Sequence, residues 1–330
     1  MRFLFRLFAM ALLLAVAAGG YVVYLLNQPY KAFSEPVFVE FPHGTSTNEM
    51  ARMLTEKGVI EQPWLLQAAR VLRRGKALQA GEYRFEKPAT PLEVFGRIAR
   101  GDIYYMELLI PEGYNMFDIA GAVEKLGTIK ASAFLAAARN PALVKDLDPK
   151  AESLEGYLFP NKYRLYRHTT AQQLCRQMVA EFRTQWQSLG SKEDVHRTVT
   201  LASLVEREAR LPEERAKVAS VFQNRLKVGM KLDCDPTTVY AALLEDRYRG
   251  VIHRSDLDNK NPYNTYQHVG LPPGPIANPG LRSIRAALEP ADTPYLFFVA
   301  KADGSGGHNF SDSLRQHEAA VAQYHRATHH

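Results

Sequence analysis

The first 26 residues constrain this chain more than any other segment. Residues 7–26 read LFAMALLLAVAAGGYVVYLL and contain no charged side chain. A helix needs about 20 consecutive apolar residues to cross the hydrocarbon core of a bilayer. Arg2 and Arg6 precede the run, and a basic flank favours the cytoplasmic side for that end. We therefore predict a cytoplasmic tail over residues 1–6, a membrane anchor over 7–26 and a short polar tether over 27–36.

A cleaved signal peptide is the alternative to an anchor. Ala15, Val16 and Ala17 resemble the small-residue site at which signal peptides are cut. The apolar run continues through residues 22–26, however, which makes it longer than the apolar segment of about 7–15 residues in a signal peptide. This length favours an uncleaved anchor. Both interpretations carry the rest of the chain across the membrane.

Length, composition and charge limit the classes of protein to which the chain can belong. A length of 330 residues suits about two domains. The two cysteines, Cys175 and Cys234, form one disulfide in an oxidising compartment or stay buried thiols. The net charge of +6 is scattered along the chain, unlike the clustered charge of nucleic-acid-binding proteins, so we expect no nucleic-acid partner. The sequence contains no phosphate-binding, dinucleotide-binding or zinc-protease motif, and we expect neither a cofactor nor a metal.

Hydrophobic spacing predicts short strands and helices after the tether. We expect strands over 37–41 and 80–85, and helices over 47–57, 64–72 and 91–100. The turn FPHG (41–44) is similar to the turn IPEG (110–113), and each lies between a predicted strand and a predicted helix. This similarity suggests two related strand–turn–helix units, although any strand–turn–helix segment shares these features.

The predicted secondary structure changes at about residue 151, where longer helices separated by irregular loops begin. Helices are predicted over 170–186, 195–210, 212–228 and 281–288, with another beginning at Asp235, a buried strand over 295–300 and a last helix capped by Ser313. This order predicts an α+β fold. We expect an N-terminal region over residues 37–150 and a mixed helix-and-sheet domain over 151–330.

One predicted helix places a carboxylate where an apolar residue is expected. At 100° per residue, Leu201, Leu204, Val205 and Glu208 share one face, whereas Glu206 lies on the opposite side. Removal from water raises the pKa of a carboxyl group and suits it to general-acid catalysis near neutral pH. The alternative is a carboxylate at the margin of the apolar stripe, paired with an arginine of a neighbouring helix. Helical spacing alone leaves both open.

Three weaker features also leave alternatives open. His308 follows two glycines, which either brings its imidazole close to a ligand or forms a simple turn. Asp235 precedes a proline, which is typical of a helix N-terminus but also fits a catalytic acid. The loop over 261–276 is rich in Pro, Gly, Asn and Tyr, which suits either contact with sugars or a rigid connector.

Several segments together resemble one family. They are AESLEGYLFPNKYRL (151–165), LASLVEREA (201–209), VASVFQNRLKVGMKLDCDPTTVY (218–240), YNTYQHVGLPPGPIANPG (263–280) and GGHNFS (306–311). In this order, behind an N-terminal anchor, they look like the endolytic murein transglycosylase family, also called YceG-like. The stretch over 111–120 is similar to the core of a LysM-like module. The resemblance implies a LysM-like module within residues 37–150 and a catalytic domain over 151–330.

The resemblance also implies an activity and the residues that perform it. The catalytic acid, the second glutamate of the family's V-E-x-E motif, falls on Glu208, and Glu206 becomes a supporting residue. The positions expected along the glycan groove are Tyr157, Asp235, Asn264, Thr265, Tyr266 and His308. The implied reaction cleaves the β-1,4 bond between N-acetylmuramic acid and N-acetylglucosamine in peptidoglycan and leaves a 1,6-anhydromuramoyl end.

The implied setting follows from the same resemblance. The chain would be anchored in the cell inner membrane, with its catalytic domain in the periplasm. Its partners would be peptidoglycan strands and the cell-wall synthases (penicillin-binding proteins), and it would terminate nascent strands. Two other functions stay open: a muramidase that uses the same acid with water, and a non-catalytic scaffold that holds the wall through the LysM-like part.

Overall fold

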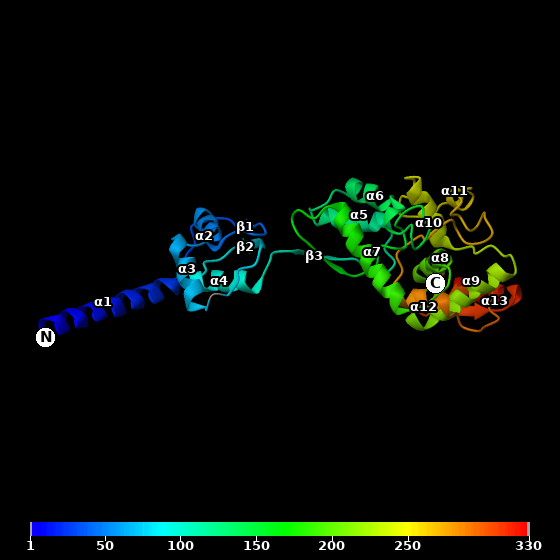
Figure 1. Ribbon diagram of the computed structural model, residues 1–330. Coiled ribbons are helices and arrows are strands. Elements are labelled where there is room, and N and C mark those ends of the chain that lie inside the picture. Colours follow the sequence, from blue (N-terminus) through cyan, green and yellow to red (C-terminus); the bar gives the residue numbers. More distant parts are fainter. Residues whose placement is uncertain (1, 75, 329–330) are drawn as a thin grey trace. The chain divides into compact units, whose positions relative to one another are not determined.

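The computed structural model describes residues 2–74 and 76–328, and the chain divides between Tyr105 and Met106 into two compact units (Figure 1). We call them the N-terminal unit and the C-terminal unit, and each has its own hydrophobic core. The predicted boundary at residue 150 differs from this division. By packing, residues 106–150 belong to the C-terminal unit.

Helix α1 (Arg2–Leu26) covers the predicted anchor. Within residues 2–74 and 76–328 it is the one helix whose length and composition suit it to cross a membrane, a property that a signal sequence shares. Nearly all its side chains are exposed, but its last residue, Leu26, is 1% exposed and lies in the core of the N-terminal unit. The helix therefore ends inside that unit.

The rest of the N-terminal unit forms as predicted. Its elements are β1 (Val37–Phe41), α2 (Thr47–Glu56), α3 (Pro63–Leu72), β2 (Gly81–Phe85) and α4 (Pro91–Arg100). The two strands pair antiparallel, and Val39 lies opposite Tyr83 with both side chains buried. Thr90 and Glu93 form a capping box that fixes the start of α4. Local capping and alternating burial thus account for these elements.

The predicted tether is bound to this unit over part of its length. Tyr30 and Ala89 exchange two backbone hydrogen bonds, of 3.1 and 3.3 Å. The backbone N–H of Ala32 donates to the carbonyl of Gly58 at 2.9 Å. The segment is therefore a packed connection between α1 and β1, held by backbone contacts that a polar sequence does not reveal.

The C-terminal unit begins with strand β3 (Met106–Leu109), which pairs antiparallel with β4 (Lys162–Leu165). Between them lie α5 (Met116–Lys125), α6 (Ala131–Ala138) and a 3-10 turn (Pro141–Leu143). Because the sheet joins residues on both sides of position 150, those two stretches fold together. This pairing is the physical reason why the packing boundary falls earlier than the sequence predicts.

The two turns that resemble each other in sequence also have similar structures. Each leads from a strand into a helix, β1 into α2 and β3 into α5. Gly44 and Gly113 have φ angles of +88° and +80°, in the left-handed region that favours glycine. The predicted strand–turn–helix elements are thus present in both copies, although each copy's strand pairs within a different sheet.

The remaining elements surround helix α8 (Val195–Glu208), whose residues Thr198–Val205 are all buried. They are α7 (Ala171–Ser188), a 3-10 turn (Pro212–Glu214), α9 (Arg215–Lys227), α10 (Asp235–Leu244), α11 (Arg254–Leu257), α12 (Leu281–Leu288), β5 (Phe297–Ala300), β6 (His308–Ser311) and α13 (Leu314–Thr328). Helices α9, α10 and α12 all contact α8. A mixed α+β fold is therefore confirmed.

Several predicted elements differ in detail. The helix predicted over 195–210 ends at Glu208, and the one predicted over 212–228 begins with a 3-10 turn before α9. Asp235 is the first helical residue of α10, and Cys234 occupies the cap position. The strand predicted as buried over 295–300 is β5, whose side chains are partly exposed because β6 is its one partner strand.

A buried carboxyl group connects three segments of the C-terminal unit. Glu155 accepts hydrogen bonds from the backbone N–H of Met116 (2.8 Å), the hydroxyl of Tyr240 (3.0 Å) and the side-chain amide of Asn278 (2.7 Å). It is 2% exposed. Burial raises the pKa of Glu155 to about 8, although the hydrogen bonds from Met116 and Tyr240 act in the opposite direction.

Glu155→Gln should remove a pH dependence of stability. Between pH 4.5 and about 8 the folded state keeps a proton on Glu155 that the unfolded state has lost, so stability is fully present below this window and falls as pH rises through it. Between pH 5 and pH 8, the melting temperature of the parent should drop by roughly 5 °C more than that of the variant. Circular dichroism of the full chain in detergent measures both.

Glu152→Gln is the matched control, because Glu152 is exposed nearby in the same loop. It should keep the pH dependence of the parent. Equal slopes for the parent and Glu155→Gln would contradict the assigned role of Glu155.

Candidate active site

Glu208 is the last residue of α8, and the backbone of Ala209 is already extended. On the same face, Leu201, Leu204 and Val205 are buried, as the helical spacing predicts. The Glu208 side chain itself is half-buried. Helix α8 thus passes through the core and ends with one carboxyl group at the boundary between core and solvent.

Several groups act on the charge of Glu208. Burial is the main cause of its raised pKa, and the negative charge of Asp235 adds to it, whereas Cys234, His308 and Arg207 lower it. The C-terminal end of a helix carries a partial negative charge, which also disfavours a carboxylate. The balance raises the pKa of Glu208 above its usual range, which favours the protonated form that a general acid needs.

Cys234 is the closest polar partner of this carboxyl group. Its Sγ donates a hydrogen bond to Oε1 of Glu208 at 3.2 Å. Burial raises the pKa of the Cys234 thiol, so the thiol keeps the proton that it donates. Both cysteines are free and buried, which excludes the predicted alternative of a disulfide. Sequence reasoning left Cys234 without a role, although it lies within one of the segments that carry the resemblance.

Asp235 and Tyr266 form a polar pair next to Cys234. The Tyr266 hydroxyl donates to Oδ1 of Asp235 at 2.7 Å. Asp235 is exposed and Tyr266 is half-buried, so both reach solvent. Burial and then the Asp235 carboxylate raise the pKa of Tyr266, which keeps its hydroxyl protonated. The placement of these two residues fits the expectation that they line a groove.

Asn264 and Thr265 are instead part of the scaffold, and the structure corrects the expectation that they face a glycan. They are 0% and 1% exposed. The Asn264 amide donates to three backbone carbonyls of the preceding segment, at 2.7–3.1 Å. The Thr265 hydroxyl accepts from the backbone N–H of Cys234 at 3.0 Å and contacts the hydroxyl of Thr237. At these two positions the loop is a rigid connector.

His308 lies at the start of β6, close enough to Glu208 to affect its charge. Its Nδ1 donates to the carboxylate of Glu214 at 2.7 Å, and the same carboxylate accepts from its backbone N–H. Among the described residues, Nε2 of His308 has no hydrogen-bond partner. Glu214 therefore orients the ring and leaves one nitrogen available. Sequence reasoning missed Glu214 because the contact joins distant segments.

Glu206 points away from this group. Its carboxylate accepts from Arg215 at 3.0 Å and from the backbone N–H of Gly280 at 2.9 Å, and its side chain is 5% exposed. Arg215 also lies 3.5 Å from Glu112. The carboxylate–arginine pair considered as an alternative for Glu208 is thus found at Glu206. Its supporting role is to join α8, α9 and the start of α12.

Tyr157 lies in the core, which differs from its expected place along a groove. It is 0% exposed, and its hydroxyl donates to the carboxylate of Asp148. Asp148 also binds Nδ1 of His196 at 2.7 Å. Tyr157 therefore belongs to the hydrophobic core of the C-terminal unit.

A cavity of about 900 Å³ adjoins the same end of α8. Arg207, the residue before Glu208, lines it and donates to the carbonyl of Gly113 at 3.1 Å. Tyr114 and Tyr248 line it from other segments. Aromatic rings beside a few polar groups are typical of ligand-binding clefts.

Comparison with known proteins defines the class of this fold and site. The YceG-like family matches residues 39–323, which is most of the chain. A crystal structure of a YceG-like protein from Listeria monocytogenes is 31% identical, covers 86% of this chain and 99% of its own, and has a TM-score of 0.55. The chain therefore belongs to the YceG-like family, as the sequence motifs indicate.

Named relatives agree with this membership. A Bacillus subtilis (strain 168) protein called endolytic murein transglycosylase is 31% identical, over 93% of this chain and 90% of the relative. A protein of the same name from Streptococcus pneumoniae serotype 2 is 29% identical over 94% of this chain, which spans 63% of that relative.

The two glutamates of α8 should differ in their effect on stability. Glu206→Gln should lower the melting temperature by roughly 5 °C or more, because it removes the closer carboxylate partner of the buried Arg215 and leaves the longer contact with the more exposed Glu112. Glu208→Gln should leave the melting temperature unchanged or higher, because a neutral amide replaces a carboxyl group whose charge is disfavoured by burial. Thermal unfolding of the full chain in detergent at pH 7 compares them.

Glu213→Gln serves as the control, since Glu213 is exposed just beyond the helix. Equal losses for Glu206→Gln and Glu208→Gln would contradict this division.

Proposed function

We propose that this chain is an endolytic murein transglycosylase that cleaves peptidoglycan with Glu208 as its catalytic acid. The observation that carries the proposal is the half-buried carboxyl group of Glu208, whose pKa is raised at the end of a buried helix. Membership of the YceG-like family and the names of two relatives, both called endolytic murein transglycosylase, support the substrate.

The proposed reaction needs one carboxyl group. Glu208 donates its proton to the oxygen of the β-1,4 bond between N-acetylmuramic acid and N-acetylglucosamine as the bond from C1 breaks. The resulting carboxylate accepts the proton of the muramoyl 6-hydroxyl, whose oxygen attacks C1 and closes a 1,6-anhydro ring. The enzyme regains its proton and no water is consumed.

The surroundings of Glu208 support these steps. The Cys234 thiol donates to the Glu208 carboxyl group and can stabilise its anion midway through the reaction. The positive charge of a protonated His308 would act in the same direction. Asp235 and Tyr266, which reach solvent, would contact the glycan beside the cleaved bond. The cavity lined by Arg207 and Tyr114 would hold further sugars.

We extend the proposal to the setting of the enzyme. α1 would anchor the chain in the inner membrane with its N-terminus in the cytoplasm and its catalytic unit in the periplasm; its length, apolar composition and basic start support this. A LysM-like module within residues 37–150 would bind glycan. Cell-wall synthases of the penicillin-binding class would be the partners, and cutting beside them would terminate nascent strands.

Glu208→Gln should reduce cleavage at least about 100-fold, because positioned proton transfer typically contributes about 10²–10⁴-fold. Purified peptidoglycan is incubated with the full chain in detergent, and mass spectrometry counts anhydromuramoyl ends. Glu213→Gln should match the parent.

The products of the parent separate the rival functions. Anhydromuramoyl ends support the transglycosylase. Ends heavier by one water would replace it with a muramidase, and strands that are bound but left intact would replace it with a scaffold. Normal cleavage by Glu208→Gln would overturn the assignment of the acid.

The pH profile should respond in opposite directions to two substitutions beside Glu208. Because the acid must be protonated, activity falls as pH rises through its pKa. Asp235→Asn removes a charge that raises the pKa of Glu208, so the alkaline limb should move to lower pH. Cys234→Ala removes a hydrogen bond that lowers this pKa, so the limb should move to higher pH. Shifts in one common direction would contradict these roles.

A further inference from the structure

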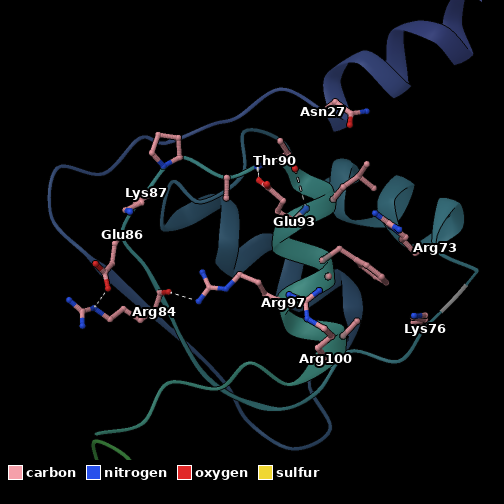
Figure 2. A pocket seen from close by; sticks show the side chains of 16 residues that line it. Asn27, Arg73, Lys76, Arg84, Glu86, Lys87, Thr90, Glu93, Arg97 and Arg100 are labelled. Atoms are coloured by element: carbon pink, nitrogen blue, oxygen red, sulfur yellow. Dashed lines mark hydrogen bonds and ion pairs between the residues drawn. The ribbon is translucent and has the colours of Figure 1, made fainter.

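The N-terminal unit contains a basic cavity of about 970 Å³ that the proposed reaction does not use. It is built around α4, and Asn27 lies at its edge, immediately beyond α1 (Figure 2). The basic residues among those that line it are Arg73, Lys76, Arg84, Lys87, Arg97 and Arg100. Glu86 and Glu93 are its acidic residues. The cavity therefore carries a net positive charge.

Three exposed cations of the cavity have no carboxylate partner among the described residues. Arg84 lies 3.0 Å from Glu86, and Arg100 lies 2.8 Å from Asp102. Arg73, Lys76 and Lys87 have no ion pair with any described residue, and all three are exposed.

Two further charged residues of the cavity, Glu93 and Arg97, have partners within the protein. Glu93 is engaged in the α4 capping box, where it accepts from the backbone N–H of Thr90 at 2.8 Å. Arg97 donates to the carbonyl of Arg84 at 2.9 Å. The cavity thus presents three free cations to an anionic ligand.

The position of the cavity relative to α1 is fixed. Leu26 is buried in the core of the unit, and Val22 and Leu25 pack against the same core. Asn27 donates to the carbonyl of Val23 at 2.7 Å, which caps the helix end beside the cavity. Since a helix rises about 1.5 Å per residue, the cavity begins within a few ångströms of the apolar run. In a bilayer this depth is the headgroup region.

The end of α3 supports the same placement. Val71 and Leu72 are 80% and 52% exposed, and Arg73, Arg74 and Lys76 follow them. Exposed apolar side chains next to basic ones are typical of segments that lie in a membrane interface.

We propose that this cavity binds the phosphate-bearing headgroup of an anionic phospholipid in the leaflet from which α1 emerges. The inference rests on the membrane anchoring proposed above. The bound headgroup neutralises Arg73, Lys76 and Lys87, and it holds the N-terminal unit against the membrane surface. A free phosphate ion would fit the charge but not the location, because the cavity opens at the end of an apolar helix.

The test is native mass spectrometry of the full chain in detergent, titrated with phosphatidylglycerol and with phosphatidylcholine. The parent should retain phosphatidylglycerol preferentially. The double variant Arg73→Gln/Lys87→Gln should weaken that retention by about 5-fold for each charge removed. The matched control is Arg52→Gln/Lys57→Gln, which removes the same charges from α2 and its cap, outside the cavity. It should bind like the parent.

Each other outcome overturns the inference. Equal retention of phosphatidylglycerol by the parent and Arg73→Gln/Lys87→Gln would show that the cavity is not the site. Displacement of the lipid by millimolar inorganic phosphate would indicate a free-anion site, and equal binding of both lipids would remove the charge requirement.

Two further measurements distinguish failure of the lipid-binding inference from failure of the proposed function. Extraction of cell membranes with alkaline carbonate tests the anchor, since a chain released into solution would remove the basis of the inference. Cleavage of peptidoglycan in detergent tests the enzyme alone.

Discussion

A carboxyl group taken out of water is costly unless donors converge on it, and the C-terminal unit places such a group where three segments meet. Glu155 receives hydrogen bonds from the start of α5, from Tyr240 of α10 and from Asn278, which precedes α12. Asn278 in turn donates to the carbonyl of Tyr114 and accepts from the backbone of Leu158. The start of α10 carries Cys234 and Asp235, so the network that fixes α10 also fixes the groups beside Glu208.

The two glutamates of α8 have different surroundings and therefore different roles. Glu206 accepts hydrogen bonds from Arg215 and from the backbone N–H of Gly280, which makes it a structural cross-link. Glu208, two residues on, lies on the apolar face and ends the helix beside the thiol of Cys234. Helical geometry separates the two side chains by roughly 200°, so the same motif serves the scaffold on one side and the proposed proton transfer on the other.

The sequence predicts what is local and misses what is not. The helix predicted over residues 91–100 begins where expected, with Thr90 as its cap, and periodicity correctly places Glu208 on the same face as the buried Leu204 and Val205. The contact between Glu214 and His308 joins segments 94 residues apart, and the pairing of β3 with β4 crosses the predicted domain boundary. A motif position also does not reveal which way a side chain faces. The family resemblance therefore predicts a glycan contact at Asn264, although its amide donates to backbone carbonyls of the preceding segment.

The connection between α1 and the N-terminal unit determines whether the positive charge of that unit can interact with a membrane surface. On a flexible tether the unit would spend much of its time farther from the membrane than the screening distance of about 8–10 Å at physiological salt. Its cations would then attract anionic headgroups only weakly. Here the buried Leu26 and the backbone bonds of Tyr30 and Ala32 hold it to the end of the helix. The charge of Arg73 and Lys87 consequently lies at a defined depth from the apolar run. The net charge of +6, scattered along the sequence, does not predict a membrane contact. Three exposed cations without a carboxylate partner, held at a fixed distance from the apolar run, do predict one.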